Sequence, residues 1–142
     1  MDIIRRNTDY ALRAAVELAG RFDDGPVSAR TLADSRNIPY QLACKLLQRL
    51  HNAGIVKSSM GPDGGFVLCK KPSKITVRQV VEAVQGPVRI SRCLASKSFC
   101  SLSPDCPINP ELARLQKTIN ASLGRITLRH LSAHNGSKRR KR

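Results

Sequence analysis

Apolar residues recur every three or four positions through the first half of the chain, a spacing that predicts three short helices. The first is expected over residues 8–21, with Thr8 as its N-cap. A second helix is expected to start near Ser28, and a third to follow the turn at Asn37 and end before Gly54. Two short helices across a tight turn are typical of a helix-turn-helix motif.

The third predicted helix has two different faces. Its apolar side is expected to be buried and consists of Ala43, Leu46, Leu47 and Leu50. Amide and lysine side chains lie on the other side and suit the reading of base edges in a major groove. The alternative is an ordinary solvated polar face. The candidate DNA contacts on this helix are Gln41, Lys45, Gln48 and Arg49.

The next segment predicts a β-hairpin. Residues 55–60 and 66–69 have strand character, and a turn rich in glycine separates them. Glycine at the tip allows the backbone to approach DNA closely, although glycine can also serve only to close the hairpin. A hairpin after a helix-turn-helix motif is a wing. Its candidate DNA contacts are Lys57, Ser59, Gly61, Gly64 and Gly65.

Two further helices are expected downstream. Thr76 and Gln79 have the spacing of a capping box, and the helix that they open is expected to bury four valines and to end at Gly86. Another helix begins near Pro110 and carries an apolar stripe. This stripe is expected to pack against a second copy of the chain in a two-fold dimer, or alternatively to fold back on its own domain. Its residues are Leu112, Leu115, Ile119, Leu123 and Ile126.

The charge and the aromatic content of the chain limit the class of binding partner. The formal net charge is +15, and a terminal basic run over residues 138–142 supplies five of these charges. Such a surplus favours a polyanionic partner, and an aromatic content of 4% disfavours the stacking of unpaired bases, so duplex DNA is expected. The sequence contains no recognisable paired acid and base and no phosphate loop, so an enzyme is not expected. No membrane span or secretory signal is evident, and we expect a cytoplasmic protein.

The segment over residues 88–110 contains three cysteines, Cys93, Cys100 and Cys106, among serines and prolines. The chain has five cysteines, and an odd number in a reducing compartment argues against a disulfide framework. A metal site or a reactive thiol remains. Thiolates suit zinc and iron-sulfur clusters, and the wide spacing favours a cluster over a structural zinc ion.

Four features together resemble the Rrf-type regulators, which include IscR and NsrR. They are the opening Thr-Asp-Tyr-Ala-Leu-Arg-Ala at 8–14, the helix at 38–54, the Gly-Pro-x-Gly-Gly-Phe wing at 61–66 and the cysteine triplet. The resemblance covers about residues 4 to 131. It implies a homodimeric winged-helix transcriptional regulator whose cysteines bind a 2Fe-2S or 4Fe-4S cluster that alters DNA binding.

By this resemblance, Cys93, Cys100 and Cys106 are the cluster ligands. A histidine three residues after the last cysteine completes the site in IscR, and this position is Asn109 here. In NsrR the aspartate of the Thr-Asp motif is supplied by the other subunit, which makes Asp9 the candidate fourth ligand. The alternative for Asp9 is a carboxylate favoured by the dipole of its own helix.

The sequence thus predicts a mainly α fold with a small β-hairpin wing and a long C-terminal dimerisation helix. The expected parts are a winged helix-turn-helix domain at 1–87, a cluster-binding loop at 88–110, a dimerisation helix and end segment at 111–132, and a disordered basic tail at 133–142. The expected function is a repressor controlled by a cluster that senses redox, nitric oxide or iron status. The alternatives are a cluster-free regulator that responds through thiols, zinc or a partner protein, and a basic packaging protein without sequence preference.

Overall fold

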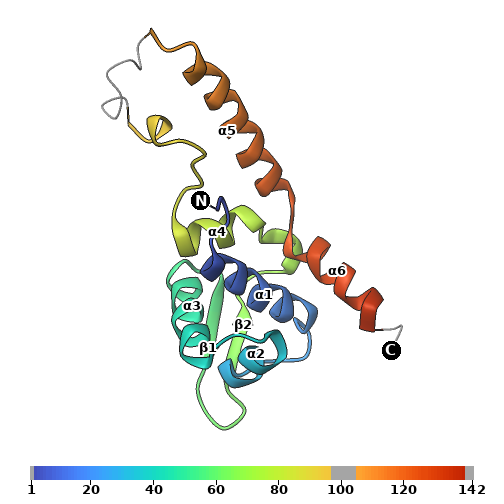
Figure 1. The fold of residues 1–142 in the computed structure, drawn as a ribbon. Helices are drawn as coiled ribbons and strands as arrows, with labels where there is room; N and C mark the ends of the chain where they lie inside the picture. The colour runs from blue at the N-terminus through green and yellow to red at the C-terminus, as the bar shows by residue number, and fades with distance from the viewer. Residues whose placement is uncertain (1, 97–104, 140–142) are drawn as a thin grey trace.

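The computed structural model describes residues 2–96 and 105–139, which form a mainly helical protein with one β-hairpin (Figure 1). The predicted fold class is confirmed. In chain order the elements are α1 (Arg6–Gly20), α2 (Ala29–Arg36), α3 (Tyr40–Asn52), β1 (Val56–Ser59), β2 (Gly65–Leu68), the 3-10 turn η1 (Pro72–Lys74), α4 (Val77–Gln85), the 3-10 turn η2 (Arg92–Leu94), α5 (Ile108–Arg125) and α6 (Leu128–Arg139).

Helix α1 is the centre of the core, because α2, α3, α4 and α6 all pack against it. Its inward face consists of small residues and Leu18, which allow the other helices to approach closely. The core also includes Leu47 of α3, Val80 of α4 and Leu128 of α6, each of which is fully buried. The last helix is therefore part of the same core as the helix-turn-helix motif.

The start of α1 differs from the prediction. Thr8 is not the N-cap: the helix begins at Arg6, and Thr8 lies inside it with a side-chain exposure of 0%. The Thr8 hydroxyl donates a hydrogen bond of 2.7 Å to Oε1 of Gln85, and the backbone N–H of Arg5 donates to the same oxygen. The amide of Gln85 also donates to the carbonyl of Ile3, so it ties the N-terminal segment to the end of α4.

The helix-turn-helix motif agrees with the local sequence signals. Ser28 is the N-cap of α2, where its side chain accepts a hydrogen bond from the backbone of Thr31. Asn37 ends α2 with a positive φ of 55°, a conformation that asparagine tolerates better than most residues. Pro39 precedes α3 and provides no side-chain cap.

Strands β1 and β2 form an antiparallel wing in which Lys57 pairs with Val67 and Ser59 with Gly65. A third short segment, which was not predicted, joins the wing. Val27, just before α2, exchanges two backbone hydrogen bonds with Phe66 of β2, at 3.0 and 2.8 Å. The wing is therefore fixed at its base to the start of the helix-turn-helix motif.

The capping box of Thr76 and Gln79 at the start of α4 is present, and all four valines of α4 are buried. After α5 the chain returns to this point, because Thr127 pairs with Thr76 and the N–H of Leu128 donates to the carbonyl of Ile75. Residues 133–139 of the predicted disordered tail are helical, since α6 continues to Arg139, and residues 140–142 lie outside the described residues. Leu128 and Leu131 hold this helix against the domain.

One buried ionic group was not predicted. Glu17 of α1 is only 3% exposed, and its carboxylate accepts hydrogen bonds of 2.7 Å from Arg21 and from Arg36 of α2. Burial alone raises the pKa of this carboxyl, but the hydrogen bonds and charges of Arg36 and then Arg21 outweigh that effect and lower the pKa below its ordinary value. Glu17 thus joins α1 to the helix-turn-helix motif.

Candidate DNA interface and cysteine segment

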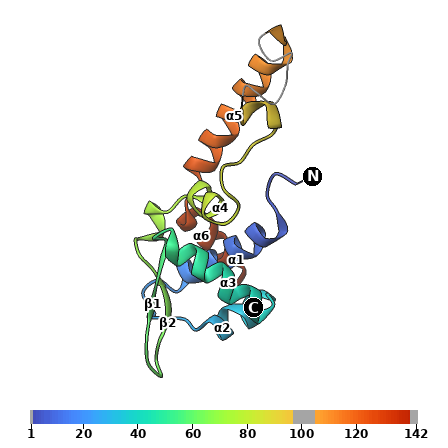
Figure 2. The same cartoon turned by 90° about the vertical axis from the view of Figure 1, so that its left-hand side faces the viewer.

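The polar face of α3 is free of the core. Its four apolar residues are buried as predicted, whereas Gln41, Lys45 and Gln48 are exposed. Figure 2 shows α3 toward the viewer, with the wing on one side and α2 below. The amide of Gln48 donates to Asn52 one turn later, at 3.1 Å, which orders the exposed end of this row. An exposed polar row on one helix beside a β-hairpin is the arrangement that a helix needs to enter a major groove.

Arg49 differs from the other candidate contacts of α3 by a hydrogen bond to the neighbouring helix. Its guanidinium donates a hydrogen bond of 2.7 Å to the carbonyl of Val84, at the end of α4. The end of a helix leaves carbonyl groups without intrahelical partners, and a cation is a favourable donor there. Arg49 is exposed, one helical turn after Lys45, and this hydrogen bond ties α3 to the end of α4.

The wing glycines have two different surroundings. Gly61 has a φ of 107° and open space around it, which agrees with a tip residue that can approach a ligand. A Cβ at Gly64 would lie 2.3 Å from the carbonyl oxygen of Ser59, and a Cβ at Gly65 would lie 2.5 Å from the backbone of Val27. Gly64 and Gly65 are therefore required by the protein's own backbone. Lys57 and Ser59 are exposed on β1.

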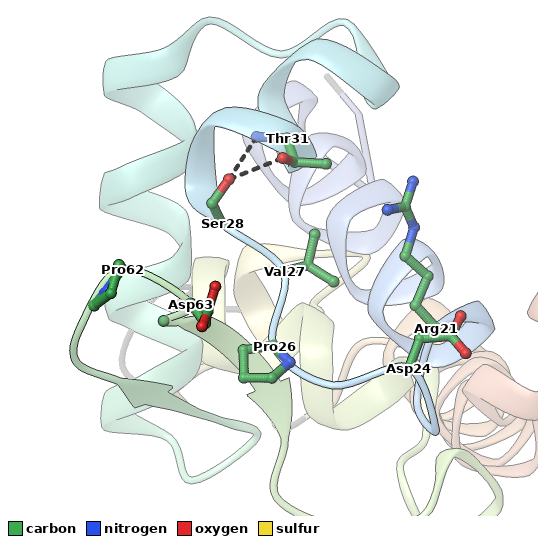
Figure 3. Close-up of a pocket in the computed structure, with 9 residues that line it drawn as sticks. Arg21, Asp24, Pro26, Val27, Ser28, Thr31, Pro62 and Asp63 are labelled. Atoms are coloured by element: carbon green, nitrogen blue, oxygen red, sulfur yellow. Dashed lines mark hydrogen bonds between the residues drawn. The ribbon is translucent and has the colours of Figure 1, made fainter.

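An open hollow of about 580 Å³ lies between the wing tip and the α1–α2 connection (Figure 3). Asp24 borders it on one side and Asp63 of the wing on the other, and Arg21 at its edge is already paired with Glu17. Two carboxylates make this hollow a poor place for a phosphate group. The exposed positions of α3 and β1 are better placed for DNA.

The apolar stripe of α5 divides into two halves. Ile119 and Leu123 pack on a small cluster formed by α4 residues and Val88. Toward the other end, Leu115 is 51% exposed and Ile108 is 62% exposed, and α5 projects away from the domain (Figure 1). No residue of α5 is fully buried. Leu112 is half-buried, and Ile126 lies just after the helix and is exposed.

The cysteine segment is attached to α5 by Gln116. Its Oε1 accepts a hydrogen bond of 2.9 Å from the N–H of Ile90, and its Nε2 donates one of 2.8 Å to the carbonyl of Val88. Cys93 in η2 is half-buried, with its sulfur 3.0 Å from the hydroxyl oxygen of Ser91. Cys106 is a half-buried free thiol just before α5. Cys100 lies outside the described residues.

Asp9, the predicted fourth ligand, is on α1. Its carboxylate forms an ion pair of 2.6 Å with Arg13 and is 49% exposed, which leaves it accessible to another chain. Within residues 2–96 and 105–139, no three histidine, cysteine or acidic side chains lie together as a metal site would need. In the same ranges, no helix is both long enough and apolar enough to cross a bilayer.

Comparisons with known proteins give one consistent result. A family model described as Rrf2, iron-dependent transcriptional regulator, matches residues 4–134. The chain is 33% identical to IscR of Yersinia enterocolitica over 122 residues, covering 86% of this chain and 74% of the relative. The solved structure of CymR, the global cysteine regulator of Bacillus subtilis, superposes with a TM-score of 0.80 at 29% identity, covering 94% of this chain and 98% of CymR. The solved structure of IscR from T. potens has a TM-score of 0.76 at 23% identity and covers 93% and 87%.

Proposed function

Because this chain belongs to the Rrf2 family of transcriptional regulators, which are DNA-binding winged-helix proteins and not enzymes, we propose that it reads duplex DNA with α3 and the wing. The observation that carries this proposal is the exposed row of Gln41, Lys45 and Gln48 beside β1. Amide side chains can bond two atoms of an adenine edge, and lysine reaches guanine or phosphate. A protein bound across a promoter blocks access to it, so we propose repression as the mode of regulation.

The active form that we propose is a homodimer joined through α5. The apolar half of this helix around Leu112 and Leu115 is uncovered in one copy of the chain. Two copies related by a two-fold axis would cover each other's stripe and would present two recognition helices to half-sites about one helical turn apart.

We further propose that Cys93, Cys100 and Cys106 hold an iron-sulfur cluster, with Asp9 of a second copy as fourth ligand. The donor set fits such a group, since Cys93 and Cys106 are free, half-buried thiols in a segment whose sequence is rich in serine and proline. A bound cluster would supply reversible redox chemistry and reactivity toward small oxidants. Gln116 would fix the start of this segment to α5, so a change in the conformation of the segment on cluster binding or loss would shift α5, the proposed dimerisation helix.

A cluster-free regulator is the second candidate. One observation favours it: among the described residues, Cys93 and Cys106 have no further histidine, cysteine or acidic side chain close enough to complete a metal site. In this alternative, the thiols or a partner protein would carry the signal. The solved CymR is named for cysteine regulation, and it is as similar to this chain in fold as the solved IscR.

Purification without oxygen separates these two candidates. We expect a coloured protein with matching iron and acid-labile sulfide, both lost in a Cys93→Ser variant and retained in a Cys69→Ser control, whose exposed cysteine lies outside the segment. Asp9→Ala should then lower cluster retention without affecting the fold. A colourless protein that cannot be reconstituted with iron and sulfide supports the cluster-free regulator.

DNA selection from a random pool tests the recognition surface. A regulator should bind its selected duplex at least about a thousandfold more tightly than a scrambled one, whereas a packaging protein would bind both alike. Footprints and affinities with and without the metal then decide whether the cysteine segment controls DNA binding. Identical footprints and affinities in both states would still support a DNA-binding regulator, but they would show that the cluster does not control its DNA binding.

A further inference from the structure

Arg30 and Tyr40 form a stacked pair at the edge of the helix-turn-helix motif. The guanidinium carbon of Arg30 lies 3.8 Å from the centre of the Tyr40 ring, which is a close cation–π contact. Arg30 belongs to the first turn of α2, and Tyr40 is the first residue of α3. The stack therefore joins the N-terminal ends of the two helices that define the motif.

The charge of Arg30 has no carboxylate partner in residues 2–96 and 105–139, where the ion pairs use other arginines. It also lies at the positive end of the α2 dipole, where a cation is unfavourable and an anion is favoured. The Ser28 side chain caps one N–H of this turn (Figure 3), and no acidic residue is present in it.

The N-terminal end of α3, like that of α2, carries a positive helix-dipole charge with no acidic residue beside it. Pro39 provides no side-chain hydrogen bond to the first N–H groups of α3, and the first turn contains no acidic residue. Two helix N-termini without an acidic residue in their first turns, and one guanidinium without a carboxylate partner among the described residues, thus meet at the Arg30–Tyr40 contact. This combination is suited to an anion.

The stack also fixes how the guanidinium is presented. The guanidinium carbon lies over the Tyr40 ring, its N–H groups make no hydrogen bond within the described part of the chain, and both side chains are exposed. A planar guanidinium held in this way can donate two parallel hydrogen bonds to the oxygens of one phosphate. An unstacked arginine would lose more side-chain freedom on binding.

The position of Arg30 and Tyr40 in the helix-turn-helix motif favours a DNA backbone phosphate as the anion. In helix-turn-helix proteins the recognition helix enters the major groove, and the helix before it crosses the phosphate backbone. Tyr40 directly precedes Gln41, the first candidate base contact of α3. We propose that Arg30, held by Tyr40, clamps a backbone phosphate at the rim of the major groove and so fixes the register of α3; this rests on the proposed docking of α3 in that groove.

The test uses the duplex selected by the wild-type protein and a scrambled duplex, each titrated over a range of salt concentrations. Arg30→Gln should weaken binding to both duplexes by about tenfold, and the slope of log affinity against log salt should fall by about 0.9 per half-site. Arg129→Gln removes the same charge from an exposed position on α6, which Figure 1 places on the side away from α3. This control should change binding less than about twofold, with an unchanged slope.

The role of the ring is tested separately. Tyr40→Phe keeps the stacking surface and should bind as the wild type does, whereas Tyr40→Leu should weaken binding by about threefold. Arg30→Gln should then have a smaller effect in the Tyr40→Leu background than in the wild type, because the two residues act as one unit. Fully additive losses would overturn the role of Tyr40.

The remaining outcomes are distinguishable. A loss confined to the selected duplex, with an unchanged salt slope, would mean that Arg30 reads a base and does not clamp a phosphate. Normal binding by Arg30→Gln, together with lost sequence preference in Lys45→Gln, would overturn the clamp and leave the proposed docking intact. Normal binding by both variants would overturn the docking itself. Circular dichroism and thermal unfolding confirm that each variant is folded.

Discussion

Arg49 of the recognition helix donates a hydrogen bond of 2.7 Å to the carbonyl oxygen of Val84 in the last turn of α4. Immediately after this turn, Gly86 ends the helix and the chain enters the cysteine segment, whose start is fixed to α5 by Gln116. The carbonyl contacted by Arg49 is thus only a few residues from the segment that carries Cys93. Arg49 therefore contributes to the orientation of α3 on the rest of the protein.

Arg49 and Lys45 should respond differently to substitution. Arg49→Met keeps most of the apolar stem but leaves a carbonyl without its charged donor, so we expect the free energy of unfolding to fall by about 1–2 kcal/mol. Its DNA binding should keep the wild-type salt slope. Lys45→Gln should leave stability unchanged and reduce the slope, because Lys45 is exposed on the groove face. Urea unfolding and salt titrations measure both effects, and equal slopes in the two variants would contradict this assignment.

The Glu17 carboxyl makes stability depend on pH. Its pKa is lower in the folded protein than its ordinary value of 4.5, so the unfolded chain binds more protons in the intervening range. The stabilisation is therefore fully present above about pH 4.5 and is lost as the pH falls through the lowered pKa. Thermal unfolding across the range from pH 7 to pH 3 should show a decline below about pH 4.5 to which Glu17 contributes.

The Glu17→Gln variant isolates this contribution. It leaves Arg21 and Arg36 without their carboxylate, and because both arginines remain partly exposed to water we expect a loss of about 2 kcal/mol at pH 7. The difference in stability between this variant and the wild type should shrink as the pH falls below 4.5, since protonated Glu17 resembles glutamine. A difference that stays constant with pH would refute this explanation.

The uncovered half of α5 should control the oligomeric state. Leu115→Glu places a charge on the exposed apolar stripe, and we expect a folded monomer in sedimentation velocity experiments. Ala121→Glu is the matched control, because six residues further along a helix is about 240° away and Ala121 is exposed. A dimer in both variants would exclude α5 as the interface.

The Gln116 side chain should protect the start of the cysteine segment. Gln116→Ala removes the acceptor for the Ile90 N–H and the donor for the Val88 carbonyl, each worth about 1 kcal/mol. We expect faster hydrogen exchange at Ile90 and faster alkylation of Cys93 in the metal-free protein. Asn120→Ala is the control, since Asn120 accepts from Gln116 but does not contact the segment in the described hydrogen bonds. Unchanged exchange and alkylation in Gln116→Ala would count against this role.

Sequence patterns predicted the features that depend on neighbours along the chain. The capping box of Thr76 and Gln79, the start of a helix near Ser28 and the buried row of α3 all follow from spacings of a few residues, and the structure confirms them. Such features are decided by local hydrogen bonds and helical periodicity, which the sequence contains directly.

The features that were missed depend on residues far apart in the chain. Threonine is a residue type favoured at helix N-caps, but the Thr8 hydroxyl donates its hydrogen bond to Gln85, which is 77 positions away. The polar tail after Ser132 has no apolar period, and its helix continues from Leu128 and Leu131, which pack on the core. Arg49 lies beside the polar row of α3, and only the position of α4 shows that it bonds Val84.

The return of the chain at Thr127 and the burial of Leu128 beside Leu18 have a consequence for how the protein folds. Helix α6 completes the core of the helix-turn-helix motif, so the part expected at residues 1–87 shares one core with the C-terminal helix. We therefore expect one cooperative unfolding transition for the protomer, and a fragment that stops before α6 should expose part of its interior and unfold at a lower temperature. The helix-turn-helix motif and the C-terminal helix α6 should therefore unfold together, and destabilising α6 should also lower the stability of the proposed DNA-binding face.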